Sequence, residues 1–239
     1  MKRILITGAT SGIGLELAKL CAKRGYSVIA CGRNQQALEE LAVNENIEKL
    51  QFDVTDLDAV KQALGEVKCD TAVLNAGVCE YVDMDAFEPQ MFQRVFAANF
   101  FGVVNCIEPL IEALPQGGQL LIVDSLARLL PFTRSQAYGA SKAAVHYLTK
   151  SLQVDLAHKG ITVQSVSPGF IETPLTDKND FEMPMKITAQ EAVVAFLDGI
   201  EKRDSSIYFP KIFSLILRFL SIMPSWAKVS ISKKIKQNQ

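Results

Sequence analysis

The sequence predicts an α/β fold: a single doubly wound parallel sheet with helices on both faces. Two observations predict it. Short apolar segments of strand length alternate with segments of helical periodicity, as parallel strands joined by helical crossovers require. A glycine-rich turn at residues 7–14 also lies where the first strand ends and the first helix begins, the place at which such sheets bind a ligand.

The order of the elements along the chain follows from this alternation. Predicted strands occupy residues 4–6, 27–31, 50–54, 71–74, 119–123 and 162–166. Helical spacing is clearest at residues 15–23, 35–41 and 136–158, with Gly160 placed to end the last helix. Residues 177–184 are polar and turn-rich, and we interpret them as a lid.

Composition describes one ordinary globular domain. The chain has 239 residues, of which 49% are hydrophobic and 21% charged, so its core is sizeable. The five cysteines are scattered and form no CxxC pair, so neither disulfides nor a metal site is predicted. A net charge of −1 gives no reason to expect nucleic-acid binding, and the first residues lack the apolar region of a signal peptide. We therefore expect a cytoplasmic protein.

The glycine-rich turn has the chemistry of a phosphate-binding loop. Glycines permit positive φ and a close approach of backbone N–H groups to phosphate oxygens, and the following helix adds the partial positive charge of its N-terminus. A purely structural turn is the alternative. On the phosphate interpretation, the candidate contacts are Gly8, Thr10, Ser11, Gly12, Ile13 and Gly14.

The end of the second strand bears on the choice of cofactor. An NAD-selective site usually has an acid there to accept hydrogen bonds from the adenosine ribose. This chain has Gly32, Arg33 and Asn34 instead. A guanidinium can pair with a 2′-phosphate, so the sequence favours NADP(H) over NAD(H). The alternative is a surface arginine at a helix start.

Tyr138 and Lys142 are four residues apart at the start of the long predicted helix, so their side chains share one face. A phenol is a weak base near neutral pH, but a nearby ammonium stabilises the phenolate and lowers the pKa of the phenol. Such a pair can exchange a proton with a carbonyl or an alcohol. Taken alone, the spacing favours a surface Tyr/Lys pair.

These motifs occur in the order and at the spacing of a known family. TGATSGIG at residues 7–14, Asn75-Ala76-Gly77, Asn99, Ser125, YGASK at 138–142 and Pro168-Gly169 together resemble the classical short-chain dehydrogenase/reductase (SDR) family over about residues 2–208. The resemblance implies a Rossmann-like domain. It also implies an enzyme that transfers a hydride between a nicotinamide and a carbonyl or alcohol carbon.

The resemblance assigns four catalytic residues. Tyr138 would be the general acid/base, and Lys142 would lower its pKa and hold the nicotinamide ribose. Ser125 would orient the substrate oxygen. Asn99 would hold a water that links Lys142 to solvent.

Further cofactor contacts are implied in the same way. Asn75, Ala76 and Gly77 would lie beside the adenine ribose, although a simple strand-ending turn is the alternative. Asp53 and Val54 would contact adenine, unless Asp53 only caps the helix near Thr55. Pro168, Gly169 and Thr173 would flank the nicotinamide. Two departures from the family pattern are Leu74 before Asn75, and Asp124 where a serine usually precedes Ser125.

The tail differs in chemistry from the rest of the chain, so we divide the chain into an SDR domain at 1–209 and an extension at 210–239. The extension carries six basic residues and no acid, and residues 212–223 are almost continuously apolar. Twelve residues are too few to cross a bilayer. Phe213, Ile216, Leu217 and Leu220 share one helical face, which could pack on the fold, on a partner subunit or on a membrane surface.

The sequence therefore predicts an NADP(H)-dependent oxidoreductase with a Ser-Tyr-Lys mechanism and a small-molecule carbonyl or alcohol substrate that no motif identifies. The resemblance implies a homodimer or homotetramer. Two alternatives stay open: a catalytically silent dinucleotide-binding redox sensor, and a membrane-surface reductase of lipophilic carbonyls. The complete Ser125, Tyr138 and Lys142 set argues against the sensor, because sensing needs no such set.

Overall fold

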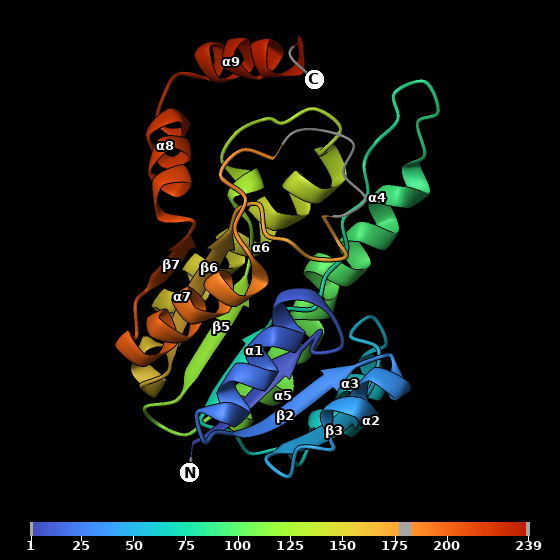
Figure 1. Cartoon of the computed structure of the whole chain (residues 1–239), viewed down its shortest axis with the longest axis vertical. Coiled ribbons are helices and arrows are strands. Elements are labelled where there is room, and N and C mark those ends of the chain that lie inside the picture. The colour runs from blue at the N-terminus through green and yellow to red at the C-terminus, as the bar shows by residue number, and fades with distance from the viewer. Residues whose placement is uncertain (1, 177–182, 238–239) are drawn as a thin grey trace.

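The computed structural model describes residues 2–176 and 183–237, and within them one sheet contains all the strands (Figure 1). Every neighbouring pair is parallel, and the order is β3-β2-β1-β4-β5-β6-β7. The predicted doubly wound α/β fold is confirmed. The strands are β1 (Arg3–Thr7), β2 (Ser27–Gly32), β3 (Ile47–Gln51), β4 (Thr71–Leu74), β5 (Gln119–Val123), β6 (Thr162–Pro168) and β7 (Ser206–Phe209).

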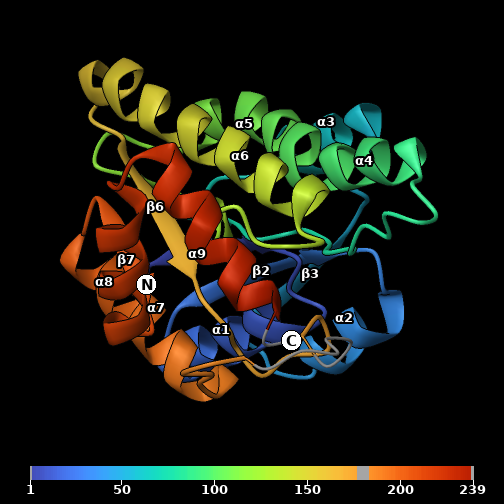
Figure 2. The same cartoon turned by 90° about the horizontal axis from the view of Figure 1, so that it is seen from above.

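Helices cover both faces of the sheet (Figure 2). One face carries α1 (Gly12–Lys23), α2 (Gln35–Leu41) and α7 (Ala189–Lys202), and the other carries α3 (Leu57–Leu64), α4 (Pro89–Phe96), α5 (Gly102–Ala113) and α6 (Gln136–Asp155). A hydrophobic core lies on each face of the sheet. In β1, Ile4 and Ile6 pack in one of these cores and Leu5 packs in the other, and all three residues are fully buried. Burial on both sides explains why the central strands are unbroken apolar runs.

The third strand lies earlier than predicted. The sequence indicated residues 50–54, whereas β3 spans Ile47–Gln51. β3 lies at one edge of the sheet and has a neighbouring strand on one side only. Its residue Ile47 is buried, while the next two residues are exposed. The rule of continuous apolar runs for parallel strands therefore misplaces it. Residues 53–55 form a side-chain-capped turn instead of strand.

The α4–α5 segment contains a π-helical turn at Ala97–Phe101. Such turns insert one residue into a helix and are frequent at functional sites. By length and composition, one helix in the described chain, Pro89–Ala113, could span a membrane. Its α4 half packs on α6 and its α5 half on α3, as expected of a core helix.

The tail forms two helices after β7: α8 (Lys211–Ser221) and α9 (Ser225–Gln237). Phe213 and Leu217 of α8 are buried and pack with Leu126 and Leu130 beyond β5. Figure 1 shows α8 rising from β7 and α9 lying across the top of the molecule. Neither β7 nor α9 was predicted. The predicted lid falls mainly on residues 177–182, outside the described residues.

Candidate active site

The glycine-rich turn brings the ends of β1 and β4 into close contact. Gly8 has φ +67°, and a Cβ there would lie 2.8 Å from Ala76 Cα. A Cβ on Gly14 would lie 2.2 Å from the Gly8 carbonyl oxygen, so only glycine allows α1 to approach the turn. Thr7 Oγ1 accepts hydrogen bonds from the backbone N–H groups of Asn75, at 3.0 Å, and Ala76, at 3.1 Å.

Asn75 and the start of α1 complete the loop. Asn75 Nδ2 donates to the carbonyl oxygen of Thr7 at 3.2 Å, so this side chain joins the two strand ends. Ser11 is the N-cap residue of α1 but makes no side-chain cap bond, and the first turn of α1 contains no acid. The first N–H groups of α1 therefore keep their capacity to bind an anion such as a diphosphate.

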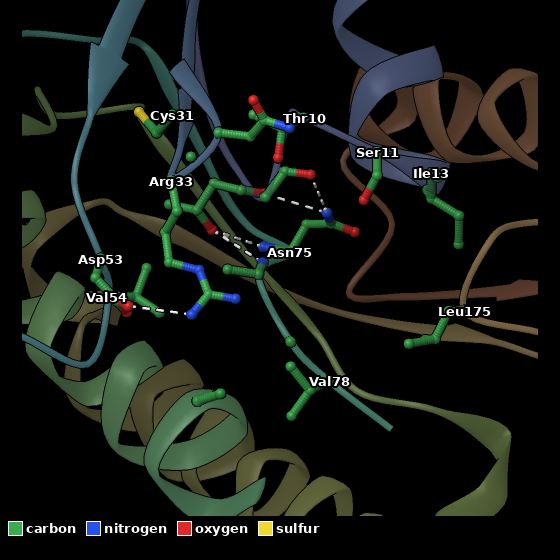
Figure 3. A pocket seen from close by; sticks show the side chains of 18 of the residues that line it. Thr10, Ser11, Ile13, Cys31, Arg33, Asp53, Val54, Asn75, Val78 and Leu175 are labelled. Atoms are coloured by element: carbon green, nitrogen blue, oxygen red, sulfur yellow. Dashed lines mark hydrogen bonds and ion pairs between the residues drawn. The ribbon is translucent and has the colours of Figure 1, made fainter. Parts of the chain in front are cut away.

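A cavity of about 440 Å³ lies beside this loop (Figure 3). Predicted cofactor residues that line it are Gly8, Thr10, Ser11, Gly12, Ile13, Arg33, Asp53, Val54, Asn75, Ala76, Gly77 and Thr173. Of the others, Gly14 lies behind the loop, Tyr138 and Gly169 line a neighbouring cavity, and Lys142 and Pro168 are buried next to the site. Lining residues that the sequence did not single out are Thr7, Cys31, Gly32, Asn34, Phe52, Thr55, Val78, Ala98, Pro174 and Leu175.

Arg33 and Asp53 meet at the edge of this cavity, as Figure 3 shows. Arg33 Nη1 lies 3.2 Å from Asp53 Oδ2, and the arginine side chain is 69% exposed. Asp53 Oδ1 accepts from the backbone N–H of Thr55 at 2.9 Å and so closes a local turn, but Asp53 does not cap a helix, because the N-cap of α3 is Asp56. Partial burial opposes ionisation of Asp53, but the Thr55 hydrogen bonds and the Arg33 charge outweigh it and lower the pKa of Asp53.

A second cavity, of about 750 Å³, contains Ser125 and Tyr138. Ser125 follows β5 and accepts from the backbone N–H of Ala127 at 3.1 Å. Tyr138, from the first turn of α6, lines the same cavity, and its interaction with the Ser125 side chain favours ionisation of the phenol. Leu175 lines both cavities and thus marks where they adjoin. Two hydroxyl-bearing side chains therefore line one cavity, where an oxygen of a bound molecule could accept from both.

Lys142 lies one turn of α6 after Tyr138, as predicted. Its Nζ is 5.9 Å from the centre of the Tyr138 ring and donates to the Val123 carbonyl oxygen at 2.9 Å. Burial lowers the pKa of Lys142 to about 8, although the Asp124 carboxylate opposes this. Lys142 is therefore a cation near neutral pH that loses its proton in mildly alkaline solution.

The predicted lowering of the Tyr138 pKa is wrong for this structure. Burial raises the pKa of Tyr138, and the neighbouring Cys79 thiol adds to the rise, while the hydrogen bond with Ser125 opposes it. Spacing alone places the ammonium near the phenol but says nothing about how far the phenol is removed from water. Desolvation of the phenolate is the larger effect here.

Asn99 lies fully buried in the π-helical turn. Its Oδ1 accepts from the Val78 N–H at 2.7 Å, and its Nδ2 donates to the Val78 carbonyl at 2.9 Å and to Ser141 Oγ at 3.0 Å. A Cβ on Gly77 would lie 2.9 Å from Asn99 Oδ1 and 3.4 Å from Lys142 Nζ. Asn99 thus lies beside Lys142, and its role with a water stays a prediction.

Asp124, noted in the sequence only as a departure, is the centre of a buried charge network. It is 1% exposed, accepts from Ser167 Oγ at 2.5 Å and lies 2.6 Å from His146 Nδ1. Arg128 Nε lies 3.2 Å from Asp124 Oδ2, the oxygen that His146 also contacts. A buried carboxylate needs such partners. An acid at the end of an apolar strand was the sequence signal that could have revealed it.

The remaining sequence expectations concern metals and thiols. Within residues 2–176 and 183–237, no group of three or more His, Cys, Asp or Glu side chains could hold a metal ion. The five cysteines are free thiols, and burial raises the pKa of each of Cys21, Cys69 and Cys106 to about 12.

Comparison with known proteins places this geometry in a family. The family model described as short chain dehydrogenase matches residues 2–183. A 3beta-hydroxysteroid dehydrogenase of Mediterraneibacter gnavus is 36% identical over 198 residues, which cover 78% of this chain and 72% of that protein.

Solved structures agree. A short chain dehydrogenase from Burkholderia cenocepacia in complex with NADP has a TM-score of 0.82 and 26% identity, covering 92% of this chain and 93% of that one. One from Burkholderia phymatum in complex with NAD shares the fold, with a TM-score of 0.79, 22% identity and coverage of 91% and 92%. The glycine turn, the cavity that Ser125 and Tyr138 line and these matches together show that the chain belongs to the short-chain dehydrogenase family of oxidoreductases.

Proposed function

We propose that the protein transfers a hydride between NADP(H) and a carbonyl or alcohol substrate by a Ser-Tyr-Lys mechanism. The observation that carries this is the position of the Ser125 and Tyr138 hydroxyls. Both side chains line the larger cavity, which adjoins the cavity of the glycine-rich turn at Leu175. The substrate is a small molecule in the larger cavity.

The residues present fit a dinucleotide. The absence of a Cβ at Gly8 and Gly14 lets the loop pack closely against Ala76 and the start of α1, and the first turn of α1 has no acid to repel a diphosphate. When bound, NADP(H) supplies or accepts the hydride. Arg33 supports the choice of NADP(H), because its exposed guanidinium lines the cavity next to the end of β2, where no acid stands.

The side chains of the chain supply the proton chemistry. During reduction, negative charge develops on the carbonyl oxygen, and the Ser125 and Tyr138 hydroxyls donate to it. The raised pKa of Tyr138 keeps the phenol protonated near neutral pH, which suits it to act as general acid. Once the proton has moved to the substrate oxygen, the Lys142 ammonium stabilises the phenolate that remains. Asn99, beside Lys142, would hold the water that returns a proton.

Tyr138→Phe tests this mechanism. The variant keeps the ring and loses the donated proton, so kcat on a carbonyl that the wild type reduces should fall by about 100-fold or more. The dissociation constant for NADPH should change little. Tyr147→Phe is the matched control, since Tyr147 lies on the same helix and is 77% exposed. If kcat is unchanged in Tyr138→Phe, Tyr138 is not the acid.

We also propose that the outer face of the tail contacts an anionic membrane surface. While Phe213 and Leu217 face the fold, Leu215, Phe219 and Ile222 are 61%, 67% and 79% exposed. The extension carries six basic residues and no acid, which suits anionic headgroups better than a second copy of the same cationic surface.

Vesicle flotation tests the membrane contact. The protein should float with vesicles containing phosphatidylserine and remain below with phosphatidylcholine alone, and Phe219→Ser should reduce flotation more than Tyr147→Ser does. Equal flotation of all forms contradicts the proposal. The proposal is also contradicted if light scattering shows a dimer that Phe219→Ser dissociates, because a second copy of the chain would then cover this face.

A homodimer or homotetramer and a cytoplasmic location stay predictions. For assembly, we propose the outer sides of the π-helical turn, α5 and α6 as the contact between copies. Phe101, Val104 and Val154 expose apolar surface there, and they come from segments that lie in one layer in Figure 2. A monomer in light scattering, at micromolar concentration, contradicts this assembly.

A further inference from the structure

The larger cavity has two chemically different ends. Ser125 and Tyr138 define the catalytic end. The two tail helices form another part of its wall, with Phe213, Leu217 and Leu220 contributed by α8 and three residues by α9. A molecule whose oxygen reaches the two hydroxyls therefore extends toward the tail if it is long enough to fill the cavity.

Most of the wall between these ends is apolar. Leu126, Leu130 and Phe132 from the segment after β5 face the cavity together with the α8 side chains, and Phe170 stacks on Phe213 with ring centres 5.5 Å apart. Such a wall favours hydrocarbon over a hydrated polar chain, by roughly 25 cal/mol for each Å² of apolar surface buried. The body of the substrate is thus apolar.

The α9 wall has a different chemistry. Ser232, Ile235 and Lys236 line the cavity and are three and four positions apart, so they share one face of α9. Ser232 Oγ is buried and has no hydrogen-bond partner in the described part of the chain. An unpartnered buried hydroxyl is unfavourable, so this position suits a polar group on a ligand.

Charge at this end is positive. Lys236 is exposed at the cavity and forms no ion pair with the residues that the structure describes, and the whole extension lacks an acid. The other charged residues of the wall are Asp83 and Arg134, both from loops, and Arg134 lies 5.5 Å above the Tyr81 ring. The ammonium and hydroxyl of α9 together form a site for an anionic group.

We propose that the substrate is an amphipathic carbonyl compound, with an apolar body along α8 and an anionic end group held by Lys236 and Ser232 of α9. This rests on the proposed function, because it assigns the catalytic end to Ser125 and Tyr138. The tail is then a specificity element as well as a cover for the cavity. A carboxylate is the simplest end group with this chemistry.

The first test compares three ketones of equal chain length in the full-length protein with NADPH. One ends in a carboxylate remote from the ketone, one is its methyl ester, and one is the unsubstituted alkyl ketone. Wild-type kcat/KM should be highest for the acid. Lys236→Ala should lower the acid-to-ester ratio of kcat/KM about tenfold, as expected for a partly exposed charge-assisted hydrogen bond, and Ser232→Ala about threefold.

Lys234→Ala is the matched control, because Lys234 lies on the same helix, is exposed and does not line the cavity. It removes the same charge and should leave the ratio within about twofold. A ratio that falls equally in the Lys234 and Lys236 variants reflects only the general positive charge and overturns the proposal. So does a wild-type enzyme that prefers the alkyl ketone.

A binding measurement separates this inference from the proposed function. Calorimetry with the NADPH-bound protein compares a saturated long-chain carboxylate with the alcohol of the same length, because NADPH reduces neither compound. The carboxylate should bind about tenfold more tightly, and Lys236→Ala should remove that difference. If no ketone is reduced but this result holds, the proposed function fails and the anion site stands. Equal binding of acid and alcohol overturns the site whatever the activity.

Discussion

Replacing Arg33 by alanine should change cofactor preference more than any other single substitution in the smaller cavity. Arg33 is the cation at the end of β2, and its Nη1 lies 3.2 Å from Asp53 Oδ2. In the wild type, the guanidinium can pair with a 2′-phosphate and at the same time balance the Asp53 charge. In Arg33→Ala both functions are lost.

The magnitude follows from exposure and charge. A charge-assisted hydrogen bond contributes about 1.5–3 kcal/mol, and the 69% exposure of Arg33 argues for the lower half of that range. A loss of about 2 kcal/mol corresponds to roughly 30-fold weaker NADPH binding. NADH has no 2′-phosphate, so its dissociation constant should change by less than about threefold.

Asp53 provides a sharper test than the single variant. Without Arg33, the Asp53 carboxylate faces the 2′-phosphate unbalanced, and this repulsion should account for part of the loss. Arg33→Ala combined with Asp53→Asn should therefore regain about threefold in NADPH affinity, because asparagine can still accept from the Thr55 N–H.

Fluorescence titration of NADPH and NADH gives six dissociation constants, two each for the wild type, Arg33→Ala and the double variant, and thermal unfolding checks that each variant folds. Equal losses for the two cofactors in Arg33→Ala would refute the 2′-phosphate role. A double variant weaker than Arg33→Ala would refute the repulsion by Asp53.

Three further substitutions test the packing and charges of the site. Gly14→Ala should lower the free energy of unfolding by more than about 2 kcal/mol, because its Cβ would lie 2.2 Å from the Gly8 oxygen. Gly25→Ala, at φ +80° with nothing within 4 Å, should lose only about 1 kcal/mol in urea unfolding, and equal losses would contradict the packing argument. Asp124→Asn should cost about 3–5 kcal/mol, because it leaves Arg128 unbalanced in a buried site. Asp198→Asn, which breaks an exposed ion pair with Lys202, is its control in the same assay, and a similar cost in both would show that the Asp124 network adds little. Finally, the pKa of Lys142 is about 8 in the folded chain and 10.5 for an ordinary lysine. Between these two pH values the unfolded chain binds more protons than the folded chain, so the folded state becomes more stable as the pH rises. The stability advantage of Lys142→Met over the wild type should thus shrink by about 3 kcal/mol from pH 8 to 10.5, and a difference that does not vary with pH would show that burial does not lower this pKa.

Local constraints explain which parts of the structure the sequence could predict. Central strands are buried on both faces, so β1, β4 and β5 are short apolar runs at their predicted places. The glycine turn is equally local, because the conformation of Gly8 and the contact at Gly14 depend on neighbouring backbone. Edge strand β3 has no such double burial, and its position was wrong by three residues at its start.

The parts that could not be predicted depend on contacts between distant segments. Asp124 is paired through His146 of α6, Ser167 of β6 and Arg128 after β5. No periodicity or motif indicates that these three meet. The α9 wall of the larger cavity is another case, since its position depends on how α8 leaves β7 and not on the composition of the tail.

The Asp124 network bears directly on the chemistry beside it. A carboxylate next to Ser125 disfavours ionisation of Tyr138 and favours the protonated form of Lys142. Without partners, this buried charge would make the phenolate hard to form. Arg128 offsets part of it, since its guanidinium lies 3.2 Å from the carboxylate, and His146 adds a second direct contact. The chain thus keeps an acid at a position where the family usually has a serine, and the guanidinium beside it limits its effect on Tyr138. The sequence showed the substitution, whereas the compensation is visible only in the folded chain.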